Sequence, residues 1–426
     1  MSWAESKLGD HIKVEHGFAF KGEHFSDRGD VIVLTPGNFH EGGGFRPRPG
    51  KDRFYTAPFP DRYLLGKGDL IVAMTEQGEG LLGSSALIPE SDRYLHNQRL
   101  GLVKARPGRA DHRFLYYLFN TPLIREQIRN TSSGAKIRHT SPERIYSVSV
   151  RLPDLITQTK IAAILSAYDE LIANNQRRVA LLESMAEEIY REWFVRMRFP
   201  GAKPETFEAG LPPGWKHEPI GGAFKFVGGA TPSKEVARYW THGEINWFTP
   251  TDITAADGIY LESSRDRCTE DGLADCSANL FPAYSVMMTS RATIGALGIN
   301  TEPACTNQGF ITCIPNEQHP LTYLYHWLKL AKPHFEMLSG GATFAELTKG
   351  TFKRIRILTP ELALAGRFET LVRPMFDQME SLQKANGKLQ STRDALLPRL
   401  ISGKLRVDQL EIQAPPSMRA DKAPAV

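Results

Sequence analysis

The sequence predicts an α+β protein with two tandem strand-rich α/β domains, each followed by a long helix, and with a pseudo-two-fold internal repeat. Two long segments with a 3.5-residue apolar period, four sequence blocks that recur in the same order, and Pro- and Gly-rich breaks between them support this prediction. The predicted boundaries are a first domain at 1–157, a first helix at 158–195, a linker at 196–213, a second domain at 214–361, a second helix at 362–402 and a disordered tail at 403–426.

Two apolar seams predict the long helices. The first runs from Ile161 to Trp193 and is interrupted by Asn175; the second begins at Phe368 and is interrupted by Asn386 at the equivalent place. An Asn that faces another Asn can form a hydrogen bond and fix the register of a helix pair. We therefore predict an antiparallel coiled coil in which both Asn residues lie near the middle. In the alternative, each helix packs on its own domain and the Asn is exposed. The residues expected to pair are Tyr168, Ile172, Asn175, Val179, Leu182, Met379, Leu382, Asn386 and Leu389.

Four blocks of the first domain recur in the second. The segment at 29–39 (GDVIVLTPGNF) matches 243–253 (GEINWFTPTDI), and 96–104 (HNQRLGLVK) matches 306–314 (TNQGFITCI). The helical pattern at 113–135 matches 322–342, and 143–153 matches 350–360. Blocks in the same order, each set ending in a long helix, indicate an internal duplication.

Two local features modify this outline. Pro374 lies inside the second helix, where a proline removes one hydrogen bond at a cost of about 3 kcal/mol, so we expect a break or a later start. From about Val407 the chain collects Pro, Ala and charge without aromatic residues, which is typical of a disordered tail.

Composition excludes several classes of protein. The chain has 426 residues and a net charge of +4, and no apolar run reaches the length that spans a membrane. The N-terminal segment has no apolar h-region, so we expect a cytoplasmic protein. Cys268 and Cys276, and likewise Cys305 and Cys313, are eight residues apart, whereas zinc ligands are usually two to four residues apart. We expect buried free thiols and no metal.

The usual catalytic motifs are absent from the sequence. It contains no Walker phosphate loop, no H-E-x-x-H and no G-x-S-x-G. The Gly-rich stretch VGGATPSK at 227–234 lacks the second Gly before Lys and is interpreted as a turn. We expect a non-catalytic protein, and an enzyme with an unfamiliar active site stays open as an alternative.

The duplication also carries a resemblance to a known family. LPPGWKHEPIGGAFKFVGGATPSK (211–234) opens the second copy and DALLPRLISGKL (394–405) closes the chain. In this order they resemble the specificity subunit of type I restriction–modification enzymes, as far as residue 406. Gln158 and Ile161 fit the helix start of that family, whereas Ala365 and Phe368 depart from it.

The resemblance implies that each domain is a target-recognition domain that reads half of a bipartite, asymmetric site in double-stranded DNA. It implies that the helices form a spacer that binds methyltransferase subunits, two in number, in a complex with restriction/translocase subunits. The assembled complex would be a site-specific endonuclease and adenine methyltransferase. This chain would hold no cofactor, because S-adenosylmethionine, ATP and Mg would belong to the partners. A helix of about 35 residues rises roughly 50 Å, more than one turn of DNA.

Base readers are expected among Arg, Asn and Gln, whose side chains match base edges with two hydrogen bonds. In the alternative, each Asn-Gln pair is a turn whose side chain satisfies its own backbone. The base-reading candidates are Thr75, Glu76, Gln77, Asn97, Gln98, Arg99, Thr289, Ser290, Arg291, Asn307 and Gln308.

Phosphate contacts are expected in basic loops, which position a protein on DNA without reading its sequence. The candidates are Arg46, Arg48, Lys51, Arg53, Lys136, Arg138, His139, Thr343, Lys349, Lys353 and Arg354. Solvated loops with no ligand are the alternative. At the level of the whole chain, the alternative function is a protein-interaction scaffold whose coiled coil serves dimerisation.

Overall fold

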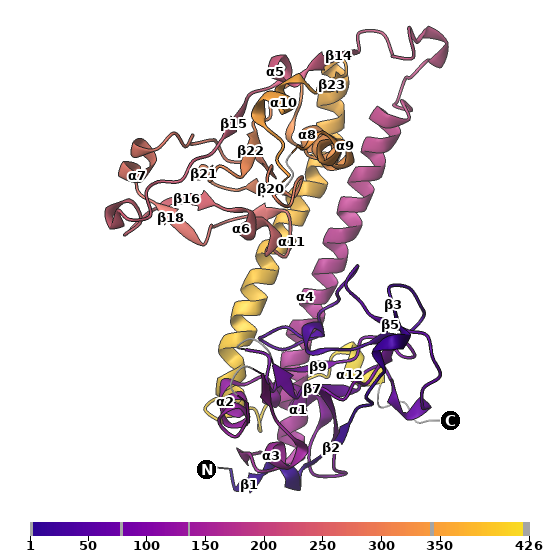
Figure 1. Ribbon diagram of the computed structural model, residues 1–426, viewed down its shortest axis with the longest axis vertical. Helices are drawn as coiled ribbons and strands as arrows, with labels where there is room; N and C mark the ends of the chain where they lie inside the picture. Colours follow the sequence, from indigo (N-terminus) through magenta and orange to yellow (C-terminus); the bar gives the residue numbers. More distant parts are fainter. Residues whose placement is uncertain (1–2, 77–79, 135–136, 341–344, 421–426) are drawn as a thin grey trace. The chain divides into compact units, whose positions relative to one another are not determined.

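The computed structural model describes residues 3–76, 80–134, 137–340 and 345–420 (Figure 1). The chain forms two compact units, Met1–Ile172 with Lys388–Val426 (unit 1) and Ala173–Gly387 (unit 2). Two long helices, α4 (Leu155–Tyr190) and α11 (Leu362–Ile401), each contribute to both units. The predicted fold class is confirmed.

Unit 1 is built on an antiparallel sheet in the order β2-β11-β7-β9. Side chains alternate across β7, so Leu70 and Val72 pack with helix α1 on one face, whereas Ile71 and Ala73 join a separate apolar cluster on the other. A second sheet, β3-β5-β4-β10-β6, contains the parallel pair β4–β10, and β1 pairs with β13 and β8 with β12. The elements are β1 (Glu5–Lys7), β2 (Ile12–His16), β3 (Phe25–Ser26), β4 (Ile32–Val33), β5 (Phe54–Tyr55), β6 (Leu64–Leu65), β7 (Leu70–Ala73), β8 (Thr75–Glu76), β9 (Ser85–Leu87), β10 (Tyr94–Leu95), β11 (Leu100–Ala105), α1 (His112–Phe119), α2 (Pro122–Asn130), β12 (Arg138–His139), α3 (Pro142–Tyr146), β13 (Ser149–Arg151) and α12 (Pro416–Ala420).

Unit 2 repeats this plan. Its main sheet has the order β15-β22-β19-β20-β17, and β16 and β21 form the parallel pair. The elements are β14 (Lys216–Pro219), α5 (Ile220–Ala223), β15 (Phe226–Gly228), β16 (Ile245–Phe248), α6 (Pro250–Thr254), β17 (Tyr260–Leu261), β18 (Asp266–Cys268), α7 (Glu270–Asp275), β19 (Val286–Thr289), β20 (Leu297–Asn300), β21 (Ala304–Thr306), β22 (Phe310–Cys313), α8 (Leu321–Leu330), α9 (Lys332–Leu338), α10 (Lys349–Arg354) and β23 (Arg356–Thr359). Both units also contain short helical turns. These are η1 (Leu8–Asp10), η2 (Gly22–His24), η3 (Pro36–Asn38) and η4 (Asp61–Tyr63) in unit 1, and η5 (Arg191–Val195), η6 (Pro204–Thr206) and η7 (Ala237–Tyr239) in unit 2. The internal duplication predicted from four sequence blocks therefore extends to strand order.

The long helices pair antiparallel inside unit 2. Asn175 Nδ2 donates a 2.9 Å hydrogen bond to Asn386 Oδ1, and both residues are buried. Further along α4 the ring of Tyr190 lies 5.9 Å from that of Phe368, so residue numbers rise on α4 as they fall on α11. The predicted meeting of the two Asn residues is confirmed. Of the other residues expected to pair, Ile172, Met379 and Leu382 are buried, and Val179, Leu182, Tyr168 and Leu389 are half-buried.

We expect Asn386→Leu to destabilise unit 2 by about 1–3 kcal/mol, because it leaves the buried Asn175 amide without its partner. The double variant Asn175→Leu/Asn386→Leu should recover most of this loss, since two apolar side chains replace the polar pair. Denaturant unfolding followed by tryptophan fluorescence measures both effects, because five of the six tryptophans lie in unit 2. Additive losses in the double variant would contradict a shared interaction.

The expected break at Pro374 is wrong: α11 runs without interruption from Leu362 to Ile401. Val372, Phe376 and Met379, on either side of the proline, have no exposed surface. Burial of one such side chain stabilises by roughly 1.5–3 kcal/mol, so together they offset the hydrogen bond that proline removes. Helix α4 begins at Leu155, three residues before the predicted start.

The expectation of a disordered tail from residue 403 is also wrong for the described residues. Val407 and Met418 are buried in the core of unit 1, and Pro416–Ala420 form α12. Arg113 donates from Nη2 to the Ser417 carbonyl at 3.0 Å, and Lys160 donates to the Asp408 carbonyl at 2.6 Å. Burial of the two apolar side chains Val407 and Met418 orders a tail whose composition as a whole is typical of disorder.

The four cysteines are free thiols. Cys268, Cys305 and Cys313 are buried, and Cys276 is partly exposed.

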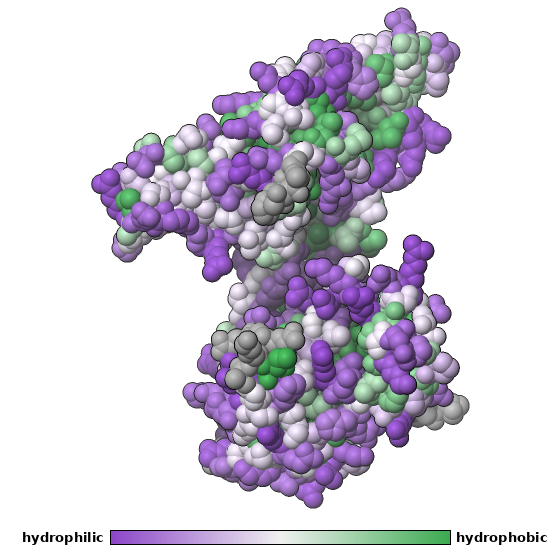
Figure 2. Space-filling view, viewed as in Figure 1, coloured by the Kyte–Doolittle hydropathy of each residue, from purple (hydrophilic) through white to green (hydrophobic). Residues whose placement is uncertain are grey.

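Hydrophilic side chains cover most of the face of each unit shown in Figure 2. Among the described helices, none combines the length and the apolar character that a membrane span needs.

Candidate nucleic-acid interface

In each unit, three segments distant in sequence meet at one end of the main sheet. In unit 2, Ser290 donates its backbone N–H to Gly309 at 2.8 Å, Leu347 donates to Ser290 at 2.9 Å, and Arg291 forms a β-bridge with Glu346. The same pattern recurs in unit 1. There Met74 donates its backbone N–H to the Arg99 carbonyl, Thr140 donates to the Met74 carbonyl, and Thr75 pairs with His139 between β8 and β12. Most base-reading candidates lie on these segments.

The hydrogen-bond pattern sets the residue correspondence between the two units. Met74 occupies in unit 1 the place that Ser290 occupies in unit 2. Thr75 therefore corresponds to Arg291, and His139 corresponds to Glu346. Likewise Arg99 stands where unit 2 has Gly309. The same backbone frame thus carries different side chains in the two units.

The Asn-Gln turns have one conformation in both units. Asn97 Oδ1 accepts from the N–H of Arg99 at 2.9 Å, and Asn307 Oδ1 accepts from that of Gly309 at 2.9 Å. The alternative in which the Asn side chain satisfies its own backbone is therefore correct for both Asn residues. A Cβ on Gly17 would collide with the carbonyl oxygen of Asn97, and one on Gly229 with that of Asn307. The loop that contains Gly17 in unit 1 and the loop that contains Gly229 in unit 2, here called the glycine loops, therefore pack directly on the two turns.

Burial separates the remaining base-reading candidates. Gln98, Arg99, Arg291 and Gln308 are exposed, and Thr75 is half-buried. Thr289 and Ser290 are buried, so their assignment as base readers is wrong. Gln77 lies outside the described residues.

Glu76 is also buried, and its assignment as a base reader is wrong for a second reason. Its Oε2 accepts backbone N–H groups from Gly80, Leu81 and Leu82 at 3.2, 3.0 and 2.8 Å. This carboxylate holds the backbone of residues 80–82. Arg125 fixes the same segment by donating to the carbonyls of Glu41 and Gly80, and burial lowers the pKa of its guanidinium.

Unit 2 has a hollow of about 310 Å³ beside its Asn307-Gln308 turn. It is lined by Pro250, Thr251, Thr254, Arg291, Ala292, Thr293, Asn307, Gln308 and Gly309. Arg291 Nε lies 2.9 Å from Glu346 Oε1, and Gln308 Oε1 accepts from Thr231 Oγ1 at 2.7 Å. Arg291 and Gln308, whose side chains can match base edges, thus line the same hollow. Glu346 holds the first and Thr231 holds the second. Thr231 and Glu346 could not be predicted from the sequence, because their partners Gln308 and Arg291 lie 77 and 55 residues away.

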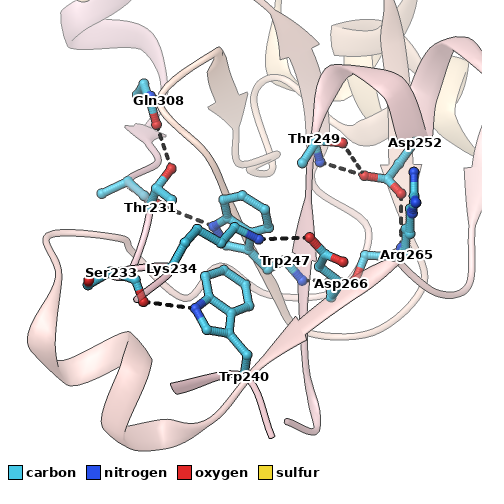
Figure 3. Close-up of polar contacts among 12 residues, drawn as sticks. Thr231, Ser233, Lys234, Trp240, Trp247, Thr249, Asp252, Arg265, Asp266 and Gln308 are labelled. Atoms are coloured by element: carbon cyan, nitrogen blue, oxygen red, sulfur yellow. Dashed lines mark hydrogen bonds and ion pairs between the residues drawn. The ribbon is translucent and has the colours of Figure 1, made fainter. Parts of the chain in front are cut away.

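The glycine loop of unit 2 is fastened by Lys234 (Figure 3). Its ammonium lies 2.8 Å from Asp266 Oδ2, 3.6 Å from the centroid of Trp240 and 4.5 Å from that of Trp247. Trp240 Nε1 donates to the Ser233 carbonyl and Trp247 Nε1 to that of Ala230. The interpretation of VGGATPSK as a turn holds only in part, because Val227 and Gly228 belong to β15 and the irregular segment begins at Gly229. The contacts of Lys234 hold this segment so that Thr231 lies beside Gln308.

The basic candidates are mostly exposed. In unit 1, Arg46, Lys51 and His139 are exposed and Arg48 and Arg138 are half-buried, whereas Arg53 forms a 3.0 Å ion pair with Asp27. In unit 2, Lys349, Lys353 and Arg354 are exposed on α10, directly after the segment that carries Glu346. Lys136 and Thr343 lie outside the described residues. No group of three or more His, Cys, Asp or Glu side chains in the described ranges is placed to hold a metal ion.

Two α/β domains of the same plan, each followed by a long helix and each carrying polar turns at one sheet end, define a class of internally duplicated proteins. The model of the type I restriction modification DNA specificity domain matches residues 1–184 and 212–366. The chain belongs to this family of type I specificity subunits.

Individual relatives agree with this assignment. The HindI specificity subunit of Haemophilus influenzae is 23% identical over 95% of this chain and 99% of its own length. The MjaIX specificity subunit of Methanocaldococcus jannaschii is 32% identical over 200 residues, so this chain spans about half of the length of that relative, 46%. The crystal structure of the S subunit from M. genitalium has a TM-score of 0.60 at 16% identity, covers 94% of this chain and 96% of its own, and shares the fold.

Proposed function

We propose that this chain is the non-catalytic DNA-recognition subunit of a type I restriction–modification system, and that it binds a bipartite, asymmetric site. The observation that carries the proposal is the repeated frame with different side chains. Arg291 and Glu346 stand in unit 2 where Thr75 and His139 stand in unit 1. Two similar frames with different polar groups suit the reading of two different half-sites.

We further propose that α4 and α11 bind two methyltransferase subunits and that restriction/translocase subunits join the same complex. Several apolar side chains on these helices are exposed, among them Ile156, Leu171, Leu181, Met185 and Leu371. S-adenosylmethionine, ATP and Mg belong to the partner subunits in this proposal.

Co-expression with a type I methyltransferase subunit from the same host, followed by mapping of methylated adenines in the host DNA, tests the proposal. The expected result is a split, asymmetric motif that disappears when this chain is deleted. A stable complex without any motif would favour the protein-interaction scaffold. Salt titration of DNA binding adds a second test, because contacts to several phosphates should make the affinity fall steeply with salt, whereas a scaffold gives no such slope.

A further inference from the structure

We propose that Arg291 reads a guanine in the half-site bound by unit 2, and that Glu346 is the positioning residue that aims it. The inference rests on the proposed function and adds to it the base, the reading atoms and the residue that prepares them. It starts from the contact between Arg291, which lines the hollow, and Glu346.

The contact orients the guanidinium. Arg291 Nε donates to Glu346 Oε1 at 2.9 Å, and the backbones of the two residues are joined in a β-bridge. Ala292 also donates its N–H to the Ala345 carbonyl, so the arginine stands on a fixed segment. Among the described residues, the carboxylate engages Nε and leaves the terminal groups Nη1 and Nη2 for a ligand.

The pair Nη1 and Nη2 matches one base edge. Guanine presents two acceptors, N7 and O6, in the major groove, and two parallel N–H donors of arginine satisfy both. Adenine presents a donor in place of O6, so it would leave one N–H of the guanidinium unpaired. The flexible arginine side chain normally loses rotamer freedom on binding, and the bond to Glu346 removes part of that freedom beforehand.

The first unit offers a matched comparison. There Thr75 and His139 occupy the positions of Arg291 and Glu346, and the exposed Arg99 occupies that of Gly309. Each unit thus presents an exposed arginine at this sheet end, Arg99 in unit 1 and Arg291 in unit 2, on different segments. Arg99→Ala is therefore the matched control for Arg291→Ala, since both remove an exposed arginine from the same frame and should affect opposite halves of the site.

Methylation mapping with the full complex tests the proposal. Arg291→Ala should keep one half of the motif and the spacer length, and should make a single guanine position in the other half degenerate. Arg99→Ala should leave that half intact. The proposal would be overturned if neither variant changed a half-site. It would also be overturned if Arg291→Ala gave the wild-type motif in a complex that still methylates. A wild-type chain that gives no motif would instead overturn the proposed function.

Binding of the purified complex to four duplexes that differ only at this guanine gives the second measurement. The wild type should discriminate roughly five- to hundredfold against the other bases, and Arg291→Ala should bind all four alike. Glu346→Ala should reduce this discrimination, and Glu346→Gln, which keeps an acceptor for Nε, should restore most of it. A uniform loss of affinity for all four duplexes in Arg291→Ala, with the discrimination retained, would assign the arginine to a phosphate and overturn base reading.

Discussion

Acidification to pH 4.5 should destabilise unit 2 through the buried His326, which alone should cost about 2.5 kcal/mol of unfolding free energy relative to neutral pH. The ring lies among Tyr190, Phe368 and Phe376, with centroid distances of 5.4, 6.4 and 5.5 Å. Nδ1 lies 2.6 Å from the Thr322 carbonyl, and Nε2 has no hydrogen-bond partner among the described residues. Burial lowers the pKa of His326 to about 4.

The direction follows from the two protonation states. In the unfolded chain the imidazole has a pKa near 6.5, whereas in the folded chain it stays neutral to about pH 4. The stability that His326 contributes is therefore complete above pH 6.5 and is lost as the pH falls from 6.5 toward 4, because only the unfolded chain binds the proton there.

Denaturant unfolding at pH 7.5 and pH 4.5, followed by tryptophan fluorescence, measures this loss. The variant His326→Phe keeps an aromatic ring among its aromatic neighbours and removes the titration, so it should lose about 2.5 kcal/mol less than the wild type on acidification. The exposed His242 of the same unit is the control position, and His242→Gln should behave as the wild type does. Equal acid losses in His326→Phe and in the wild type would show that the buried imidazole does not carry this pH dependence.

Much of the fold could be predicted from the sequence because its signals are local or repeated. The apolar seams of α4 and α11 persist over their whole length, and Asn175 and Asn386 mark equivalent places in both. The error at Pro374 arose because the cost of a proline is visible in the sequence, whereas the burial of Phe376 that offsets it is a tertiary property.

Less of the candidate site could be predicted. Arg291 and Gln308 stood out as polar side chains at strand ends, and the structure brings them to one hollow. The partner of Arg291 is 55 residues away in sequence, at Glu346, and no periodicity connects them. Glu76, like Arg291, is a polar residue at a strand end and was therefore predicted to contact bases. Only the three-dimensional structure shows that its carboxylate accepts three backbone N–H groups.

A chain that ends at Arg406 should lose about 3–6 kcal/mol of stability in unit 1, because it lacks the two buried side chains Val407 and Met418 at roughly 1.5–3 kcal/mol each. It also lacks the hydrogen bonds that Ser417 makes with Arg113 and Glu170. Arg113 lies on α1 and Glu170 on α4, so the tail joins the two helices that support the main sheet.

Hydrogen exchange of α1 should report this loss as faster exchange of the amides of residues 114–119, whereas tryptophan fluorescence, which reads mainly unit 2, should change little. A chain that ends at Ala420 is the matched control, because it keeps every tail contact named above. The single variant Met418→Ala should reproduce part of the effect, about 2 kcal/mol or more. If exchange in α1 were the same in the chains ending at Arg406 and at Ala420, the tail would pack on unit 1 without stabilising it. The loss expected here instead makes residues 407–420 part of the core of unit 1, although most of that unit lies within Met1–Ile172.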